Sequence, residues 1–514
     1  MTPGAGLLLG VRPRVAEEVL TGLLRTSGVG VREGEVLEVG GELACRVSWG
    51  GPSGLPVGSE ADVQAACGVA HVHGRRYGGP VPLGADFASV AAGVLGATGA
   101  LAALRARRLG AAYREVGVSV AQAALLGLSQ YLAAATAPEQ GWVEPGGTGG
   151  PPFGSADGVR FELEALEPDG WLRFWSELGV ERRVVGRAWP AFQARYGTAV
   201  CPLPPELFAA VRAVGHPRLA RLAAECGVEL TVVAERPAVL GGMPWRLRAG
   251  GPAPACGGGP GPGAGPLHGV TVVEITRRVQ GPLAGRVLAL LGADVVRVEP
   301  PGGDPLRGVP PVAEVGGAAV SARFAALNRG KGVLEADLRS AEGRSAVREL
   351  IGRADILLHS LAPAKVAGLG LDAEAVAALR PGLVYAQASG GGPGLSTDYP
   401  VQAHSGLAAL LAPAGEPPRP TLLTVCDVLG GLVCAAGAVA ALEARERTGR
   451  AQRVESSLLS AARLLCGAPS AGGGPAGVEA CTDLAVLARD PRVAAVLEFG
   501  PDGCAFVRAP WEFG

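Results

Sequence analysis

The sequence predicts an α/β protein that contains a parallel β-sheet. After residue 266, short continuous apolar runs of strand length alternate with amphipathic segments of helical period. Strands that are buried on both faces have this continuous apolar character, and parallel neighbours need a helical crossover between them. The chain has 514 residues, a length that favours more than one domain. The second half is therefore predicted to be a parallel sheet covered by helices on both faces.

The elements of this half follow one another regularly. A strand is expected at 270–275, then a helix at 282–292 that opens on Pro282 and closes on Gly292, and then a strand at 294–299. The later elements are a strand "VLEADL", a helix "AEGRSAVRELIGR" capped by Ser340, a strand "DILLHSL", a helix "DAEAVAALR" and a strand "LVYAQAS". Ligands of such sheets bind beyond the carboxyl ends of the strands. The first turn, "TRRVQGP", is not GxGxxG, so no dinucleotide site is predicted there.

Two segments rich in glycine and proline divide the chain. The run at 249–266 has the composition of a linker, and a similar break occupies 137–154. The predicted organisation is an Ala-rich helical segment at 1–140, a small domain at 141–248, the linker at 249–266 and the large domain at 267–514.

Charge and cysteine usage exclude some classes of protein. The 46 basic and 47 acidic residues nearly cancel, which argues against a binder of nucleic acid or of membrane surfaces. The 10 cysteines form no CxxC pair, and the first residues lack the pattern of a signal peptide. We expect reduced thiols and a cytoplasmic protein. The run at 87–104 is long enough to span a membrane, but its small residues favour a buried, tightly packed helix.

The two halves contain a repeated pattern. "VQAACGV" (63–69) followed by 84–110 is similar to "VQAHSGL" (401–407) followed by 426–449. Each copy has an aspartate before its long small-residue helix, Asp86 in the first and Asp427 in the second. This similarity predicts an internal duplication.

The second half resembles the family III CoA-transferases, which include formyl-CoA transferase, carnitine CoA-transferase and alpha-methylacyl-CoA racemase. The resemblance is carried by "GVTVVEITRRVQGPLAGRVLALLGADVVRVEPPGGDPLRG", "RFAALNRGKGVLEADLRSAEGR", "ADILLHSLAPAKVAGLGL", "PGLVYAQASGGGPG", "DYPVQAHSGL" and "TGRAQRVESSLLSAA". It implies a Rossmann-like parallel-sheet large domain and a smaller α+β domain.

The first half resembles other parts of the same family. Residues 55–135 are similar to the segment around the nucleophile, and "GVRFELEALEPDGWLRFWSELGV" is similar to the opening of the small domain. The second half lacks a small domain of its own. Because two protomers of this family interlock, the resemblance implies a fused pair that keeps one complete site, an internal pseudo-dimer. Further pairing into a homodimer is left open.

The resemblance implies that Asp427 is a nucleophile. Its carboxylate is expected to be ionised at neutral pH, because the usual pKa of an aspartate is about 3.9, and it would attack a thioester to form a mixed anhydride and then an aspartyl-CoA thioester. From the residues alone, the alternative is an N-cap. Asp86 is expected to be a relic or a cap.

The resemblance also assigns a CoA site and a covering loop. The CoA site comprises Val279, Gln280, Lys331, Arg339, Ser360, Leu361, Thr397 and Asp398, with Arg307 as a further candidate. The loop "GGTGG", with Gly146, Gly147, Gly149 and Gly150, stands where the family has a mobile cover, and an interdomain linker is the alternative reading. CoA is then a substrate, no cofactor is tightly bound, and the partners are an acyl-CoA and a small carboxylic acid.

Some positions depart from the family pattern. Gly368 and Leu395 stand where relatives have basic residues, so CoA is expected to bind more weakly, and a carrier protein's pantetheine thioester is an alternative donor. Thr397 stands where the racemases have histidine, which disfavours racemisation. His71 and His73 have no further ligand at useful spacing, so no metal site is predicted. A repurposed acyl-transfer enzyme and a non-catalytic scaffold are the other readings of the chain.

Overall fold

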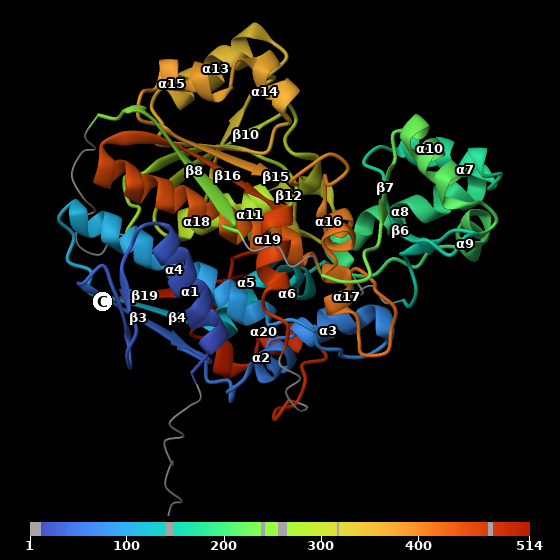
Figure 1. The fold of residues 1–514 in the computed structure, drawn as a ribbon, viewed down its shortest axis with the longest axis horizontal. Helices are drawn as coiled ribbons and strands as arrows, with labels where there is room; N and C mark the ends of the chain where they lie inside the picture. The colour runs from blue at the N-terminus through green and yellow to red at the C-terminus, as the bar shows by residue number, and fades with distance from the viewer. Residues whose placement is uncertain (1–11, 140–146, 238–241, 255–264, 316–317, 471–475) are drawn as a thin grey trace, which may run out of the picture.

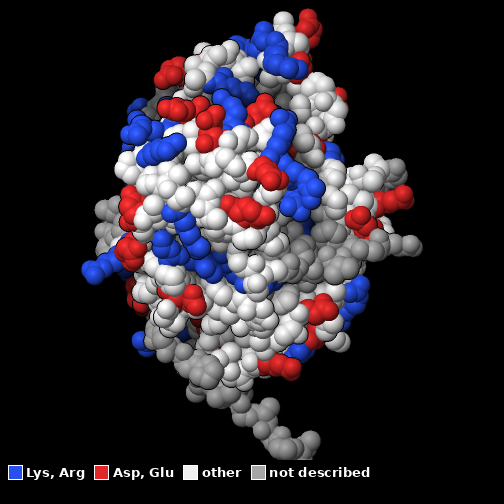
Figure 2. Space-filling model, turned by 90° about the vertical axis from the view of Figure 1, so that its right-hand side faces the viewer, with Lys and Arg blue, Asp and Glu red and all other residues white. Residues whose placement is uncertain are grey.

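The computed structural model describes residues 12–139, 147–237, 242–254, 265–315, 318–470 and 476–514. Two β-sheets, one from each half of the chain, lie on either side of long central helices, and a small domain stands at one side (Figure 1). Acidic and basic side chains are interspersed on the face that carries the small domain (Figure 2).

The larger sheet confirms the predicted parallel architecture. Its order is β13-β10-β9-β14-β15-β16-β8, and all neighbours are parallel except β8. The bounds are β8 Trp245–Pro252, β9 Thr271–Ile275, β10 Asp294–Glu299, β13 Gly332–Glu335, β14 Ile356–His359, β15 Val384–Ser389 and β16 Arg450–Ser457. The chain order reverses between β9 and β14, and in doubly wound sheets that reversal marks the crevice where ligands bind.

Helices cover both faces of this sheet (Figure 1). The helices of the second half are α11 Gln280–Leu290, α12 Ala322–Asn328, α13 Ala341–Ile351, α14 Pro363–Leu369, α15 Ala373–Leu379, α16 Asp398–Ser405, α17 Leu407–Leu411, α18 Val425–Thr448, α19 Leu458–Cys466 and α20 Leu484–Ala488. The helix predicted from Pro282 begins two residues earlier, at Gln280. Ser340 caps α13 as predicted, because its side chain accepts a hydrogen bond from the Gly343 N–H.

The smaller sheet belongs to the first half and has the order β1-β2-β3-β4-β19. Its strands are β1 Val31–Arg32, β2 Leu37–Val39, β3 Leu43–Ser48, β4 Glu115–Ser119 and β19 Trp511–Phe513. Helix α1, Arg14–Thr26, packs beside it, and α2 Glu60–Ala66, α3 Val69–Gly74, α5 Val120–Gly127 and α6 Ser129–Thr136 complete this half. The last strand of the chain, β19, pairs with β4, whereas β8 of the first half pairs with β16. Each half thus supplies one antiparallel edge strand of the other half's sheet.

The small domain has the α+β composition that the resemblance implied. Its antiparallel sheet joins β5 Phe153–Gly154, β6 Arg160–Glu164 and β7 Glu229–Val232, and its helices are α7 Pro168–Glu177, α8 Arg182–Thr198, α9 Pro205–Arg212 and α10 His216–Cys226. Buried aromatic rings form its core: Phe153, Phe161, Trp171, Phe174, Trp175 and Phe192. Hydrogen bonds tie this domain to the second half: Tyr399 Oη donates to the Arg195 carbonyl (3.1 Å), and Ser396 Oγ donates to Glu229 Oε2 (2.8 Å).

Two long helices, α4 (Phe87–Arg108) and α18 (Val425–Thr448), pack together at the centre of the molecule. Both are long and apolar enough to cross a membrane, but 94% and 100% of their apolar windows are buried within the protein. The prediction of a buried helix at 87–104 is therefore confirmed. Glycine in α18 also lets the large sheet approach closely: a Cβ at Gly437 would lie only 2.8 Å from Val454 Cγ2 of β16.

The N-cap residues of the two helices have nearly the same backbone conformation, which shows which residues of α4 and α18 correspond to one another. Asp86, the N-cap residue of α4, has φ −80° and ψ 59°, and Thr424, the N-cap residue of α18, has φ −75° and ψ 64°. Asp86 thus corresponds to Thr424, and Ser89, three residues further on, corresponds to Asp427. Pairing Asp86 with Asp427 from the sequence was wrong by three residues, because helices made of small residues match one another at several offsets.

Candidate active site

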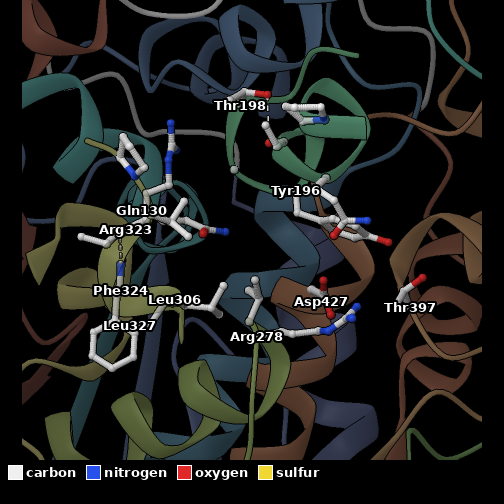
Figure 3. Close-up of a pocket in the computed structure, with 18 of the residues that line it drawn as sticks. Gln130, Tyr196, Thr198, Arg278, Leu306, Arg323, Phe324, Leu327, Thr397 and Asp427 are labelled. Carbon is white, nitrogen blue, oxygen red and sulfur yellow. Dashed lines mark hydrogen bonds between the residues drawn. The ribbon is translucent and has the colours of Figure 1, made fainter. Parts of the chain in front are cut away.

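A cavity of about 680 Å³ lies between the small domain and the second half (Figure 3). Part of its wall follows the carboxyl ends of strands: Arg278 and Val279 come after β9, and Ser396 and Thr397 come after β15. The other wall residues are Gln130, Pro190, Ala191, Gln193, Ala194, Tyr196, Gly197, Thr198, Val200, Pro202, Leu306, Val309, Pro310, Ser321, Arg323, Phe324, Leu327, Asn328 and Asp427. The cavity occupies the edge of the sheet where the fold predicts ligand binding.

Asp427 belongs to this wall. It lies in the first turn of α18 and is 7% exposed, while the N-cap position is held by Thr424. Its own N–H donates to Asp398 Oδ2 at 2.6 Å. Asp427 is therefore not the N-cap of its helix.

Asp398 is a buried capping group instead of the CoA contact that the resemblance implied. The side chain is fully buried, and Oδ1 accepts a hydrogen bond from Gln402 Nε2 at 2.5 Å. Gln402 in turn accepts from the Thr421 N–H at 2.8 Å and donates to the Thr421 carbonyl at 3.0 Å. Burial and the Asp427 charge both raise the pKa of Asp398. The carboxylate is committed to holding the start of α18.

The first half has the same arrangement, with Glu60 in the place of Asp398 and no aspartate at the position of Asp427. Glu60 accepts hydrogen bonds from the Ala88 and Ser89 N–H groups, both at 2.9 Å, and from Ser89 Oγ at 2.6 Å. Gln64 Nε2 donates to Glu60 at 3.0 Å, as Gln402 does to Asp398. Ser89 thus stands where Asp427 stands in the second half. Asp86 is the N-cap residue of α4, and its carboxylate accepts from Ser470 Oγ at 2.7 Å.

The environment of Asp427 raises its pKa to about 7. Burial is the main cause, the Arg278 guanidinium opposes it, and the Glu164 carboxylate adds to it. The expectation of a fully ionised carboxylate at neutral pH is therefore corrected: close to pH 7, protonated and ionised forms coexist.

Arg278 was missed by the sequence reasoning. Its backbone has φ +67°, in the left-handed region that residues other than glycine seldom adopt. Its guanidinium lies beside the Asp427 carboxylate in Figure 3, and its Cζ is 5.9 Å from the centre of the Tyr196 ring. The signal for it was the second arginine of the "TRRVQGP" turn, directly after the first strand of the large sheet.

Glu164 of the small domain connects two residues of the wall. Its Oε2 accepts a hydrogen bond from Thr397 Oγ1 at 2.6 Å and another from the Tyr196 hydroxyl. Arg195 Nη2 lies 3.3 Å from the same oxygen. Burial raises the pKa of Glu164, and Arg195 opposes that shift. The predicted site residue Thr397 is thereby fixed across the boundary between the small domain and the second half.

The other residues predicted to bind CoA do not all lie on the cavity wall. Val279 lines the cavity, but Gln280 is buried behind it and donates weakly to the Ser389 carbonyl (3.4 Å). Lys331 is buried, and its Nζ donates to Glu274 Oε2 (2.8 Å), the Pro282 carbonyl (2.7 Å) and Asn328 Oδ1 (3.0 Å). All three ammonium hydrogens are used internally, so Lys331 has a structural position and not the predicted CoA contact.

The remaining assigned residues lie off the cavity wall. The Arg339 side chain is 90% exposed and pairs with Asp337 at 3.0 Å. Ser360 and Leu361 follow β14 at the carboxyl edge of the sheet. Arg307 forms a paired interaction with Glu299, with both N–O distances at 2.8 Å. Contacts of these residues with CoA stay predictions.

The glycine loop lies behind part of the cavity wall. Gly146 is outside the described residues, whereas Gly147, Gly149 and Gly150 have φ values of +142°, +94° and +88°. A Cβ at Gly147 would lie 3.3 Å from the Cβ of Pro202, a wall residue. Arg76 donates to the Gly149 carbonyl at 3.0 Å. The loop's role as a cover stays a prediction.

The histidines contribute no metal site in the part of the chain that the structure describes. No group of three or more His, Cys, Asp or Glu side chains with suitable placement occurs there. His73 Nδ1 lies 2.7 Å from Thr421 Oγ1, and burial lowers its pKa to about 3. His73 is thus a buried, hydrogen-bonded residue of α3.

The chain is similar in sequence to known CoA-transferases. A family model described as CoA-transferase family III matches residues 45–234 and 267–477. The chain is 36% identical over 204 residues to a succinate–glutarate CoA-transferase of Agrobacterium fabrum, covering 38% of this chain and 51% of the relative. It is 34% identical over 209 residues to a formyl-CoA:oxalate CoA-transferase of Streptomyces avermitilis, covering 39% and 49%.

Among solved structures, a CaiB/BaiF family protein from Brucella suis is 34% identical, with a TM-score of 0.37 and coverage of 39% of this chain and 55% of that one. The chain spans about half the length of the curated relatives it matches. The family model, in contrast, matches segments in both halves and covers most of the sequence. The chain belongs to CoA-transferase family III.

Proposed function

We propose that this protein transfers CoA between an acyl thioester and a carboxylic acid, with Asp427 as the nucleophile. The supporting observation is the Asp427 carboxylate on the wall of a cavity at the carboxyl edge of a parallel sheet, in a chain of this family. The cavity holds the carboxylate in a largely dehydrated setting, where a nucleophile competes less with water.

The proposed reaction has four steps, each an attack on an acyl carbonyl. A carboxylate oxygen of Asp427 attacks the thioester carbonyl, the C–S bond breaks, and a mixed anhydride and CoA thiolate form. The thiolate attacks the aspartyl carbonyl and releases the first acid, leaving CoA as a thioester on Asp427. The carboxylate of the incoming acid attacks this thioester and expels the thiolate again. The thiolate then attacks the new acyl carbonyl, which gives the product thioester and regenerates Asp427.

Two side chains support these steps. The Arg278 guanidinium faces Asp427, where it favours the ionised nucleophile and offsets negative charge that develops on the attacked carbonyl oxygen. The Glu164 carboxylate orients Thr397 and Tyr196 along the same wall. Glu164 is a positioning residue, because it acts through these two.

Intact-mass measurement tests the function. Incubation with a panel of acyl-CoAs is expected to add the mass of CoA less water to the full chain. An adduct formed only from an acylated carrier protein would identify a pantetheine thioester as the donor, a possibility raised by Gly368 and Leu395, where the family resemblance leads us to expect basic residues. No adduct from either donor would overturn the proposal in favour of a non-catalytic scaffold.

The rate of adduct formation is expected to rise with pH and to have its midpoint near pH 7, where Asp427 deprotonates. The sign follows from the raised pKa: the nucleophilic ionised form is scarce below pH 7 and predominates above it. Replacing Arg278 with Gln removes the charge that lowers this pKa, so the midpoint should move to higher pH. A midpoint that stays unchanged in R278Q would contradict this account of Arg278.

We further propose that the chain is a fused pair of family protomers in which only one site survives. The exchange of the edge strands β8 and β19 and the repeated capping by Glu60 and Asp398 support this origin. Cleavage at a protease site introduced between residues 255 and 264 should leave two fragments that copurify, because strand pairs and the α4–α18 contact join them. Fragments that separate as folded bodies in size-exclusion chromatography would contradict the interlocked pair.

A further inference from the structure

We propose that the mouth of the cavity is a docking surface for an acidic carrier protein, which presents an acyl group as a thioester on its phosphopantetheine arm. This inference rests on the proposed function, because the arm enters the cavity that holds Asp427. It adds a protein partner to CoA as a donor of the thioester.

The cavity opens to solvent between helix α8 and the turn after β9. Of the wall residues, Pro190 and Ala194 of α8 are exposed, and so is Arg278 in the turn. The apolar wall residues Leu306 and Val309 are also exposed, at 37% and 41%. Apolar side chains that remain in contact with water beside a concave surface, with charged groups around them, are typical of a protein interface.

The helix on one side of this mouth presents a row of arginines. Helix α8 contains four arginines and no acidic residue. Its wall residues Pro190 and Ala194 are four positions apart and therefore lie on one helix face. Arg187 and Arg183, both exposed, continue this face three and seven positions before Pro190. The face of α8 that lines the cavity thus becomes basic toward the start of the helix.

These arginines are not neutralised within the described part of the protein. There, no carboxylate oxygen lies within 4.0 Å of a guanidinium nitrogen of Arg183, Arg187 or Arg277. Arg277 is exposed in the turn on the other side of the mouth, next to Arg278. Unpaired positive charge on both sides of an opening favours a negatively charged partner, because complementary charges speed encounter and fix orientation.

The predicted CoA site lacks several of its cations, which favours a carrier protein over free CoA as the partner of this surface. Gly368 and Leu395 stand where the resemblance leads us to expect basic residues. Lys331 uses its ammonium hydrogens inside the protein, and Arg339 pairs with a neighbouring aspartate. A carrier's arm has a single phosphate and no adenine nucleotide, so it needs fewer of these contacts. The acidic side chains of the carrier itself complement the arginines at the mouth.

The chemistry is that of the proposed function, with the thiol of the carrier's arm in place of the CoA thiol. The Asp427 carboxylate attacks the thioester carbonyl, and the C–S bond breaks. The thiolate of the arm then attacks the aspartyl carbonyl and releases the acid. The full chain is left with the carrier protein as a thioester on Asp427, which adds the mass of the carrier less water.

The experiment offers the full chain one acyl group on three donors: an acidic bacterial acyl carrier protein, CoA, and pantetheine, which has no phosphate. Intact mass follows the rate at which each adduct forms. The rate with the carrier is expected to exceed the rate with pantetheine by about 10-fold or more, the scale of electrostatic steering. Added salt should reduce this advantage, because it screens exposed charges. The double variant R183E/R187E should lower the ratio of the two rates by about 10-fold or more.

The matched control is R221E, which reverses the charge of an exposed arginine on α10, a helix without wall residues. Its ratio of carrier rate to pantetheine rate should equal that of the wild type. Binding of the acylated carrier to Asp427→Asn measures docking without the reaction, and R183E/R187E in that background should weaken it.

Three outcomes would contradict the proposals, and they do so separately. A carrier rate no higher than the pantetheine rate would overturn the docking surface and leave CoA transfer standing. An equal loss of rate with CoA and with the carrier in R183E/R187E would also overturn it, because the arginines would then bind the phosphates of CoA. No adduct from any of the three donors would overturn the proposed function itself.

Discussion

Replacing Asp427 with asparagine is expected to abolish the CoA adduct and to lower the rate of CoA transfer by about 10⁴-fold or more, the scale of loss when a covalent nucleophile is removed. Asparagine has nearly the same shape, and the backbone N–H that bonds to Asp398 is unchanged. The amide cannot supply a nucleophilic carboxylate oxygen. Intact-mass measurement and a transfer assay check the two effects, and the thermal midpoint should change little.

Ser89→Ala is the matched control, because Ser89 holds the corresponding position in α4 and lies outside the cavity wall. Its adduct yield should equal that of the wild type. An adduct of undiminished yield in D427N would mean that another residue accepts CoA, and the proposed chemistry would fail.

Replacing Arg195 with methionine is expected to destabilise the protein by about 3–5 kcal/mol, because buried carboxylates lose their cation. Arg195 is fully buried, with Nη2 at 3.3 Å from Glu164 and 3.9 Å from Glu162. The guanidinium also lies over the Phe192 ring, with Cζ 3.5 Å from its centre. Glu162 already has its pKa raised to about 7 by burial, so losing the neighbouring charge raises it further.

Arg187→Met is the control, since Arg187 is an exposed residue of the same helix and should change stability by less than about 0.5 kcal/mol. Urea denaturation followed by tryptophan fluorescence suits the measurement, because Trp171, Trp175 and Trp189 lie in this domain. The same midpoint in both variants would show that the ion pairs around Arg195 contribute nothing net.

The residue pattern predicted the strands and helices of the large sheet well, because each of them is specified by residues that are close together in the sequence. Continuous apolar runs, Gly292 after α11 and the Ser340 cap are readable within a few residues of each element. The α4–α18 correspondence was misjudged by three residues because alanine and glycine carry little positional information. The matching N-cap conformations of Asp86 and Thr424 and the hydrogen bonds to Glu60 and Asp398 define the offset.

By itself, the sequence determined a parallel α/β sheet, a buried small-residue helix and a family resemblance centred on Asp427. Only the tertiary structure decided which side chains share the cavity. Gln130, Tyr196, Arg278 and Arg323 come from four distant segments, and no local pattern relates them. The tertiary structure also gives Lys331 and Asp398 internal hydrogen-bond partners in place of the predicted contacts with CoA, because buried ammonium and carboxylate groups need such partners. Burial, a property of the folded chain alone, raised the pKa of Asp427 to about 7.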